Sequence, residues 1–136
     1  MIYFDTDFWI HYFVVQDRKK HLLVQKIFEK ANFDGKVFVS LLNLQEIAFV
    51  LAKLGLESFE IEEKMSNLYE FRPNNYTFKE YLRAKELCKK VGFLNINDCL
   101  HTAIAESYCT EFYTYNQTDF KQIKNHTSLK INILSA

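Results

Sequence analysis

Short apolar runs alternate with longer amphipathic stretches along this chain, and the two patterns predict different elements. Four of the runs are rich in β-branched and aromatic residues and are bounded by polar or turn-forming residues, as expected for buried strands. These predicted strands cover residues 2–5, 37–39, 112–114 and 130–134. The first of them is apolar up to the acidic residue at its end, Asp5.

The longer stretches carry apolar residues three to five positions apart, which is the spacing of one face of an amphipathic helix. This spacing is clearest over residues 18–33. Further helices are predicted over residues 8–13, 42–54, 57–71, 77–91 and 118–124, and one more carries Asp98, Ala103, Ile104 and Ala105. Ser40 is placed to cap the helix that follows it, and Asn95 or Asn97 is placed to cap the helix that carries Asp98.

Turn signals separate these elements. Gly35, Gly55 and Gly92 each follow a predicted helix. Residues 72–75, which contain the only proline, form the clearest break in the chain. Strands alternate with helices throughout, and this order predicts an α/β fold with a mostly parallel sheet covered by helices on both faces. Ligands of such sheets bind beyond the carboxyl ends of the strands.

Composition narrows the class of protein. The chain has 136 residues, of which 49% are hydrophobic, enough for the core of one domain. Three glycines and one proline leave almost no linker composition, so we predict a single domain over residues 1–136. The net charge of zero counts weakly against a protein that binds nucleic acid with its whole surface, because a local basic patch would suffice.

The cysteines and the shortness of the apolar runs indicate the cellular compartment in which the protein resides. Cys88, Cys99 and Cys109 are odd in number and form no CxxC pair, which favours a reducing environment over a disulfide scaffold. We find no charged leader followed by an apolar run, and no stretch that approaches the roughly 18–20 apolar residues of a membrane span. We therefore expect a soluble, cytoplasmic protein that does not associate with membranes.

Candidate catalytic and metal-binding residues lie where the predicted strands end. Asp5 ends the first strand, Glu46 lies about one turn into the helix after the second, and Asp98 lies in the first turn of a later helix. Asn116 and Asp119 follow the strand 112–114. Carboxylates packed together repel one another unless a cation lies among them, and Mg²⁺ or Mn²⁺ prefers such oxygen ligands. The pattern therefore predicts a metal site suited to hydrolysis of phosphodiester bonds.

Each of these acids also has a simpler interpretation. Asp5 and Asp98 could cap or begin a helix, Asp119 is a common acid of a first helical turn, and Glu46 could face solvent. A carboxylate buried without a purpose is expensive, however, and Glu46 lies close to apolar residues of its helix. The joint placement of the acids carries the prediction, since none of them carries it alone.

Four motifs in this order resemble those of PIN-domain nucleases, especially the small VapC-type toxins of prokaryotic toxin–antitoxin pairs. The motifs are Ile2-Tyr3-Phe4-Asp5-Thr6-Asp7, Ser40-Leu41-Leu42-Asn43-Leu44-Gln45-Glu46, Asn97-Asp98-Cys99-Leu100-His101-Thr102-Ala103-Ile104-Ala105 and Tyr113-Thr114-Tyr115-Asn116-Gln117-Thr118-Asp119-Phe120. The chain departs from the family pattern where Asp7 replaces the usual asparagine and where Asn116 stands at the position of a frequent fourth acid.

The resemblance implies a three-layer α/β/α domain with a central, mostly parallel sheet of four or five strands. It implies a Mg²⁺- or Mn²⁺-dependent endoribonuclease that acts on tRNA or another structured or single-stranded RNA, forms a homodimer and is inhibited by a small antitoxin. The metal would be held by Asp5, Glu46 and Asp98, with Asp119 or Asn116 as the fourth ligand.

The resemblance also suggests supporting roles for other residues. Thr6, Thr114 and Asn116 would orient water or phosphate oxygens. Lys121 and Lys124 are the basic residues nearest to the site in the sequence, and they would hold the RNA backbone. Tyr12, Phe13 and the helix 57–71 would line the antitoxin groove. His101 is expected to be a packing or helix-surface residue, although its position near Asp98 would also allow contact with substrate.

Three alternatives stay open at this point. Asp5 and Asp7 after a strand also fit a haloacid-dehalogenase-type phosphatase with an aspartate nucleophile, but that pattern expects Thr or Val where this chain has Trp9, and it leaves Glu46 without a role. A PIN-like domain that has lost activity and serves as an RNA-binding or assembly module is the second. A nuclease of RNA maturation is the third.

Overall fold

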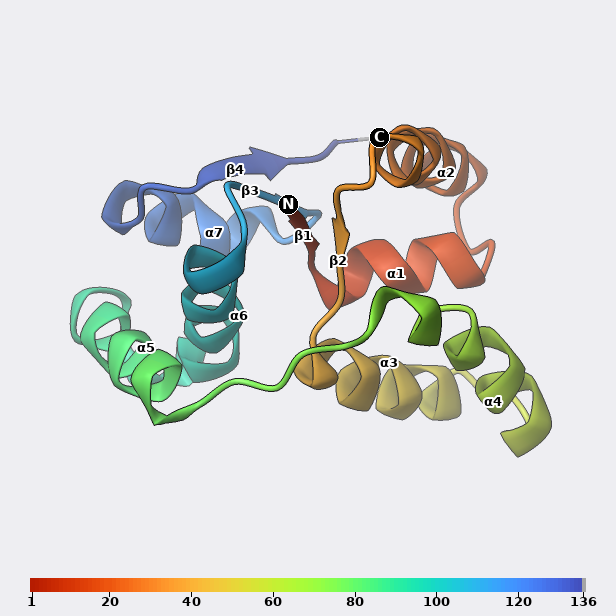
Figure 1. Ribbon diagram of the computed structural model, residues 1–136, viewed down its shortest axis with the longest axis horizontal. Helices are drawn as coiled ribbons and strands as arrows, with labels where there is room; N and C mark the ends of the chain where they lie inside the picture. Colours follow the sequence, from red (N-terminus) through yellow and green to blue (C-terminus); the bar gives the residue numbers. More distant parts are fainter. Residues whose placement is uncertain (136) are drawn as a thin grey trace.

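The computed structural model describes residues 1–135, and within them four parallel strands form one sheet (Figure 1). The strands are β1 (Ile2–Phe4), β2 (Val37–Phe38), β3 (Glu111–Thr114) and β4 (Lys130–Ile133). Their order across the sheet is β2-β1-β3-β4. The register places Tyr3 of β1 beside Phe38 on one side and Phe112 on the other. The expected mostly parallel sheet of four or five strands is thus confirmed with four strands, all of them parallel.

Helices fill the connections at nearly the predicted positions. They are α1 (Thr6–Phe13), α2 (Arg18–Phe33), α3 (Leu41–Lys53), α4 (Ser58–Ser66), α5 (Phe78–Val91), α6 (Ile96–Tyr108) and α7 (Gln117–Ile123). Short 3₁₀ turns lie at Tyr69–Phe71, Phe93–Asn95 and Lys124–His126. No helix within residues 1–135 is long and apolar enough to cross a membrane.

The prediction of one continuous helix over residues 57–71 is wrong, because the helix ends at Ser66. The Ser66 hydroxyl and the Asn67 side-chain amide both donate to the Glu63 carbonyl, at 2.7 and 3.3 Å. Side chains that bond the backbone in this way compete with the helical hydrogen-bond ladder. The chain resumes as the separate 3₁₀ turn Tyr69–Phe71.

Capping decides where two of the helices begin. Asp5 caps α1 by accepting a hydrogen bond from the Thr6 backbone N–H at 2.9 Å, so this helix starts two residues earlier than predicted. Ser40 caps α3 as predicted and accepts from the Asn43 N–H at 3.0 Å. Asn95 occupies the N-cap position of α6, but its side chain donates to the Val91 carbonyl instead, so the predicted side-chain cap is wrong.

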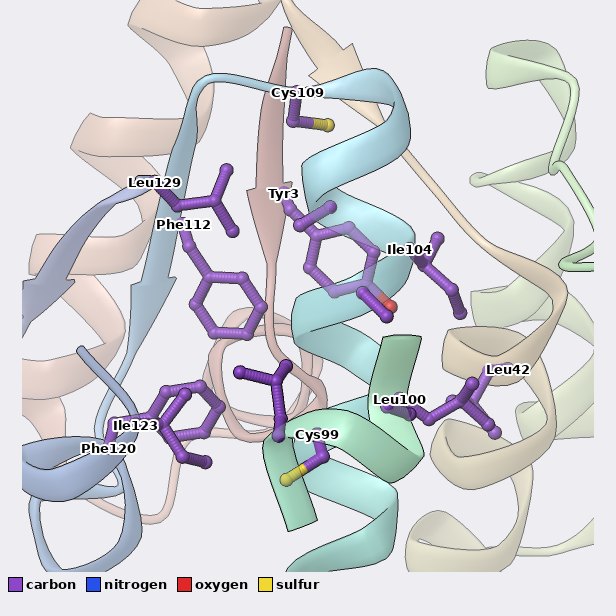
Figure 2. Close-up of a cluster of buried hydrophobic side chains, with 14 of the residues drawn as sticks. Tyr3, Leu42, Cys99, Leu100, Ile104, Cys109, Phe112, Phe120, Ile123 and Leu129 are labelled. Atoms are coloured by element: carbon purple, nitrogen blue, oxygen red, sulfur yellow. The ribbon is translucent and has the colours of Figure 1, made fainter. Parts of the chain in front are cut away.

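The sheet separates two apolar cores, as expected for a three-layer α/β/α fold. Tyr3 and Phe112 stack with ring centroids 5.1 Å apart and pack toward α5, α6 and α7 (Figure 2). Successive side chains of a strand point to opposite faces, so Phe4 lies on the other face. There it packs with Phe8 and Trp9 of α1 in the core that α2, α3 and α4 complete. All of these rings except Phe112 come from the first nine residues.

The order of the strands locates the functional edge of the sheet. From β1 the chain crosses to β2 on one side, whereas β3 and β4 lie on the other side of β1. The neighbours β1 and β3 therefore form a topological switch point, where α/β sheets open a crevice beyond the carboxyl ends of their strands. Asp5 leaves β1 at this crevice, and Asn116 follows β3 at the same place.

Candidate active site

A cavity of about 580 Å³ opens at this switch point. Side chains and backbone from the ends of β1 and β3 and from α1, α3 and α6 surround it. It is lined by Asp5, Thr6, Asp7, Leu42, Gln45, Glu46, Phe49, Val50, Asn97, Asp98 and Asn116. Four carboxylates thus reach one cavity from three separate parts of the sequence.

Asp5 lies deepest among these carboxylates, with only 5% of its surface exposed. One carboxylate oxygen, Oδ1, accepts from the Thr6 N–H at 2.9 Å, and the other, Oδ2, accepts from the Thr114 hydroxyl at 2.8 Å. Burial raises the pKa of Asp5 above its ordinary value, against the opposing effect of the His101 charge and of these hydrogen bonds. Asp5 therefore caps α1 and also lies in the cavity.

Asp7 adds a carboxylate that we did not include among the candidate site residues. It accepts from the Tyr115 backbone N–H at 3.2 Å and from the Thr114 hydroxyl at 3.3 Å. Burial and the neighbouring charge of Asp5 raise the pKa of Asp7 to about 7. The Asp-x-Asp pattern at residues 5–7 was the signal for it, because both residues lie where the chain leaves β1 and α1 begins.

Asp98 and Asn116 form the opposite end of the cluster. The Asn116 side-chain amide Nδ2 donates to Asp119 Oδ2 at 2.9 Å and to Asp98 Oδ2 at 3.4 Å. The Asn116 carbonyl Oδ1 accepts from the Asp119 backbone N–H at 3.2 Å and so caps α7. Burial, the charge of Asp5 and contact with Asp119 raise the pKa of Asp98 to about 8. Asn116 therefore presents its N–H₂ group, rather than its capping oxygen, to the two carboxylates.

Glu46 differs from the aspartates in its environment. Its oxygen Oε1 accepts from the Thr6 hydroxyl at 2.6 Å and faces the imidazole Nε2 of His101 at 2.7 Å. Burial alone would raise the pKa of Glu46, but the His101 hydrogen bond and charge, with the Thr6 hydrogen bond, hold it below its ordinary value. Glu46 is thus the best-compensated carboxylate of the cavity.

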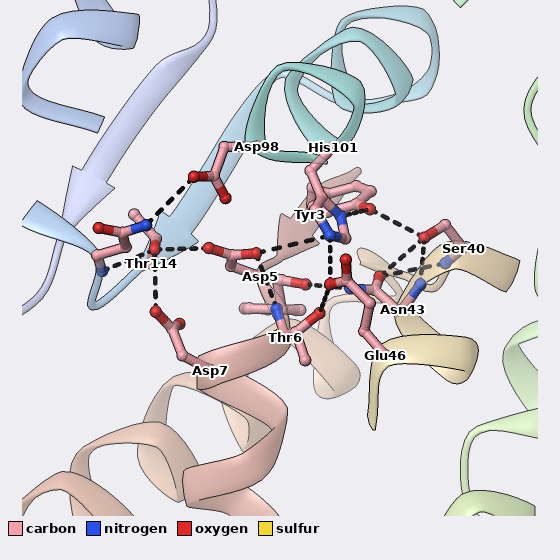
Figure 3. Close-up of polar contacts among 12 residues, drawn as sticks. Tyr3, Asp5, Thr6, Asp7, Ser40, Asn43, Glu46, Asp98, His101 and Thr114 are labelled. Carbon is pink, nitrogen blue, oxygen red and sulfur yellow. Dashed lines mark hydrogen bonds and ion pairs between the residues drawn. The ribbon is translucent and has the colours of Figure 1, made fainter. Parts of the chain in front are cut away.

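His101 belongs to a buried network that the sequence did not reveal (Figure 3). It is 1% exposed, so the expectation of packing holds and that of a helix-surface position is wrong. Its second ring nitrogen, Nδ1, meets the Tyr3 hydroxyl, which also bonds Ser40 Oγ at 2.9 Å. The available signal was that His101 lies three residues after Asp98 and so shares its face of α6.

The predicted water-orienting threonines have other partners. The Thr6 hydroxyl donates to Glu46, and the Thr114 hydroxyl donates to Asp5 while accepting from the Asn116 N–H at 2.9 Å. Both side chains therefore orient carboxylates. Lys121 and Lys124 do not line the cavity; they border a separate hollow of about 290 Å³ beside the end of β4.

The donor set of the cavity fits a hard divalent cation. Its carboxylate oxygens repel one another, and the raised pKa values of Asp5, Asp7 and Asp98 reflect negative charge that burial leaves uncompensated. In the described part of the chain, no three acidic, histidine or cysteine side chains converge as a ready-made ion cage. Mg²⁺ rarely needs one, since it usually keeps several waters and takes one or two carboxylates together with substrate phosphates.

Comparison with models of protein families gives a match. The family model described as PIN domain matches residues 2–125, a region that contains every residue of the cavity. No curated protein matches the chain.

Proposed function

This chain belongs to the PIN-domain family, and on that premise we propose that it is a metal-dependent endoribonuclease that hydrolyses phosphodiester bonds in RNA. PIN domains are generally nucleases, and PIN nucleases generally use divalent metals. The observation that carries the proposal is the convergence of Asp5, Asp7, Glu46 and Asp98 on one cavity at the switch point of the sheet.

In this proposal Asp5, Glu46 and Asp98 hold Mg²⁺ or Mn²⁺. Of the two candidates for the fourth position, Asp119 is favoured over Asn116, because the Asn116 oxygen caps α7 and its amide nitrogen faces the carboxylates. A divalent cation bound there would lower the pKa of a water ligand and stabilise charge on the scissile phosphate. The side chains around it supply orientation. Thr114 fixes Asp5, and Thr6 fixes Glu46, so that neither carboxylate has to be ordered when substrate arrives.

The phosphatase alternative explains less of the site. It leaves Glu46 idle, whereas Glu46 lines the cavity and receives two hydrogen bonds within it. The cavity also has an apolar wall of Leu42, Phe49 and Val50, with Phe49 64% exposed. The exposed Phe49 ring suits stacking with an unpaired base, because every base has a π-face.

We further propose that the protein acts as the toxin of a type II toxin–antitoxin pair. A second hollow, of about 380 Å³, lies between α1, α2 and α4 and could receive an antitoxin segment. It is lined in part by Tyr12, Phe13 and Phe28, together with the charged residues Glu63 and Lys64. Co-expression with a candidate antitoxin should abolish cleavage, and Tyr12→Ala should weaken that inhibition without changing free-enzyme activity.

We propose a homodimer as the active form. On α5, Phe78 and Tyr81 are exposed and stack on each other with centroids 5.8 Å apart, an apolar surface that a second copy would cover. Light scattering should give twice the monomer mass of 16.2 kDa, and Phe78→Asp should reduce it to that of the monomer. A monomeric wild-type protein would contradict this part of the proposal.

The function is tested by incubating labelled total tRNA and a panel of structured RNAs with the protein, in Mg²⁺, in Mn²⁺ and in EDTA. We expect discrete fragments that require metal and are absent for Asp98→Asn. The matched control is Glu86→Gln, which removes an exposed acid of α5 whose ion-pair partner is Lys89. Lack of cleavage by the folded protein with either metal would contradict the proposal and favour an inactive binding module. Release of phosphate from small esters instead would favour the phosphatase.

A further inference from the structure

The buried imidazole of His101 has no role in the mechanism proposed above, although it contacts one of the metal-site carboxylates. We infer that His101 is a positioning residue: it fixes the Glu46 carboxylate in the orientation in which Glu46 serves a divalent cation. This inference rests on the proposed metal-dependent function and adds a residue to it. It is carried by the hydrogen bonds on both sides of the imidazole ring.

The hydrogen bond between His101 and Glu46 has a defined direction. An ionised carboxylate only accepts hydrogen bonds, so His101 Nε2 must carry the proton in the 2.7 Å contact with Glu46 Oε1. The Thr6 hydroxyl donates to the same oxygen at 2.6 Å. Two donors from two different helices thus converge on Oε1, which leaves Oε2 for a cation or one of its waters.

The second observation concerns what holds the imidazole. Its Nδ1 meets the Tyr3 hydroxyl, and Tyr3 bonds the Ser40 hydroxyl at 2.9 Å. Ser40 is locked by the cap of α3, where its hydroxyl contacts both the N–H and the side-chain oxygen of Asn43. The Asn43 amide in turn donates to the Phe4 carbonyl at 3.2 Å. The ring is therefore tied to the sheet and to the helix that carries Glu46 (Figure 3).

The third observation is burial. Tyr3, Ser40 and Asn43 are fully buried, and His101 is 1% exposed, so water does not compete for these bonds. A glutamate that is not held in this way loses side-chain conformational entropy when it is ordered. Because the imidazole already orders the Glu46 carboxylate before metal binds, part of this entropy loss is avoided when the metal binds. Partners of ligating carboxylates act in this way, and their removal typically costs about 10–100-fold in metal affinity or activity.

The test measures Mn²⁺ affinity by calorimetry without RNA, so that it does not depend on catalysis. His101→Leu removes the donor and should weaken Mn²⁺ binding by about 10–100-fold. His101→Gln keeps an N–H donor near the position of Nε2 and should restore most of the affinity. In the Glu46→Gln background, His101→Leu should have no further effect, because the residue through which His101 acts is already altered.

Cleavage kinetics provide a second readout. His101→Leu should raise the metal concentration needed for half-maximal activity more than it lowers the rate at saturating metal. If His101→Leu does not fold, Tyr3→Phe removes only the hydroxyl behind the imidazole and should weaken Mn²⁺ binding in the same direction but less. Tighter or unchanged Mn²⁺ binding in whichever of these variants folds would overturn the inference.

Equal losses with and without Glu46 would also overturn it, because His101 would then act on the fold as a whole. These outcomes differ from those expected if the proposed function is wrong. If the protein is not a metal-dependent nuclease, the wild type itself would neither bind Mn²⁺ nor cleave RNA, and the inference would fall with the proposed function.

Discussion

The two ends of the carboxylate cluster face the same cavity, yet their negative charge is balanced differently. At one end, Glu46 meets His101 and the Thr6 hydroxyl, and its pKa is held below the ordinary value. At the other end, Asp98 meets the Asn116 amide and the charges of other aspartates, and burial with those charges raises its pKa to about 8. The protein thus supplies hydrogen-bond donors to the carboxylate at the Glu46 end, whereas the charge at the Asp98 end is left to an external cation.

The largest expected effect comes from removing charge at the uncompensated end. Asp98→Asn should abolish RNA cleavage, because it deletes a proposed metal ligand. It should also leave folding intact and raise the melting temperature near neutral pH, because wild-type Asp98 must take up a proton or bury its charge on folding, whereas the amide does neither. Fragment analysis and thermal unfolding measure the two effects, with Glu86→Gln as the surface control.

A variant that still cleaves at the wild-type rate would show that Asp98 holds no essential metal. A variant that loses activity together with its cooperative unfolding transition would place Asp98 in the fold instead.

The pH dependence of stability should separate the two ends without any mutation. The folded state holds protons on Asp7 and Asp98 up to pKa values of about 7 and 8, whereas the unfolded chain releases them near 3.8. The folded state therefore binds more protons, and stability should fall as pH rises from about 4 to 8. Each unit of pKa difference between the folded and unfolded states changes the free energy of unfolding by at most about 1.4 kcal/mol. Partial exposure of these groups to solvent reduces this value.

Mg²⁺ should reverse this loss. Thermal unfolding with saturating Mg²⁺ should show a larger increase in melting temperature at pH 8 than at pH 5, because the cation replaces protons that are absent at the higher pH. An equal increase at both values would mean that the ion binds away from these aspartates. Asp98→Asn should reduce the pH dependence of the stability of the metal-free protein, and the dependence that remains is assigned to Asp7.

The sequence was sufficient for the framework of the site, because that framework follows from where strands end. Asp5, Glu46, Asp98 and Asn116 were placed at the edge of a parallel sheet from local patterns alone, and all four line the cavity. The cap by Ser40 was likewise a local signal. Such features depend on residues a few positions apart, which a pattern of apolar and polar residues records.

Partners that lie far apart in the chain could not be predicted in this way. The His101–Glu46 bond joins residues 55 positions apart, and it requires both the packing of α3 against α6 and a particular side-chain rotamer. The hydrogen-bond partners of Thr6 and Thr114 could not be predicted for the same reason, since nothing local specifies which oxygen a hydroxyl will meet. The break after Ser66 depends on side-chain bonds to Glu63 that compete with a helix of otherwise suitable spacing.

A smaller effect should come from Asn116, which both caps α7 and separates two carboxylates. Asn116→Ala removes the cap oxygen and the amide bridge, and it should destabilise the protein by about 1–2 kcal/mol in urea denaturation. Asn116→Ser keeps an oxygen suited to the cap but not the bridge, so the difference between the two variants isolates the cap. Equal stability of all three proteins would mean that neither contact contributes.

The smallest effect on RNA cleavage is expected at the compensated end. Tyr3→Phe leaves the His101–Glu46 bond in place but removes the buried partner of His101 Nδ1, so the free energy of unfolding should fall by about 1–3 kcal/mol. Urea denaturation at neutral pH measures it, and RNA cleavage at saturating Mg²⁺ should stay close to wild type. A loss of cleavage as complete as that of Asp98→Asn would erase the proposed difference between the two ends.

We expect the aspartate end of the cluster to bind the cation on which RNA cleavage depends. The most direct measurement follows the rate of tRNA cleavage while Mg²⁺ is added back to chelator-treated protein, for the wild type and for Asp98→Asn in parallel. The cleavage rate of the wild type should rise with Mg²⁺ and saturate, and the variant should not cleave tRNA at any Mg²⁺ concentration. Wild-type cleavage that proceeds equally without metal, or a variant that follows the wild-type curve, would contradict this expectation.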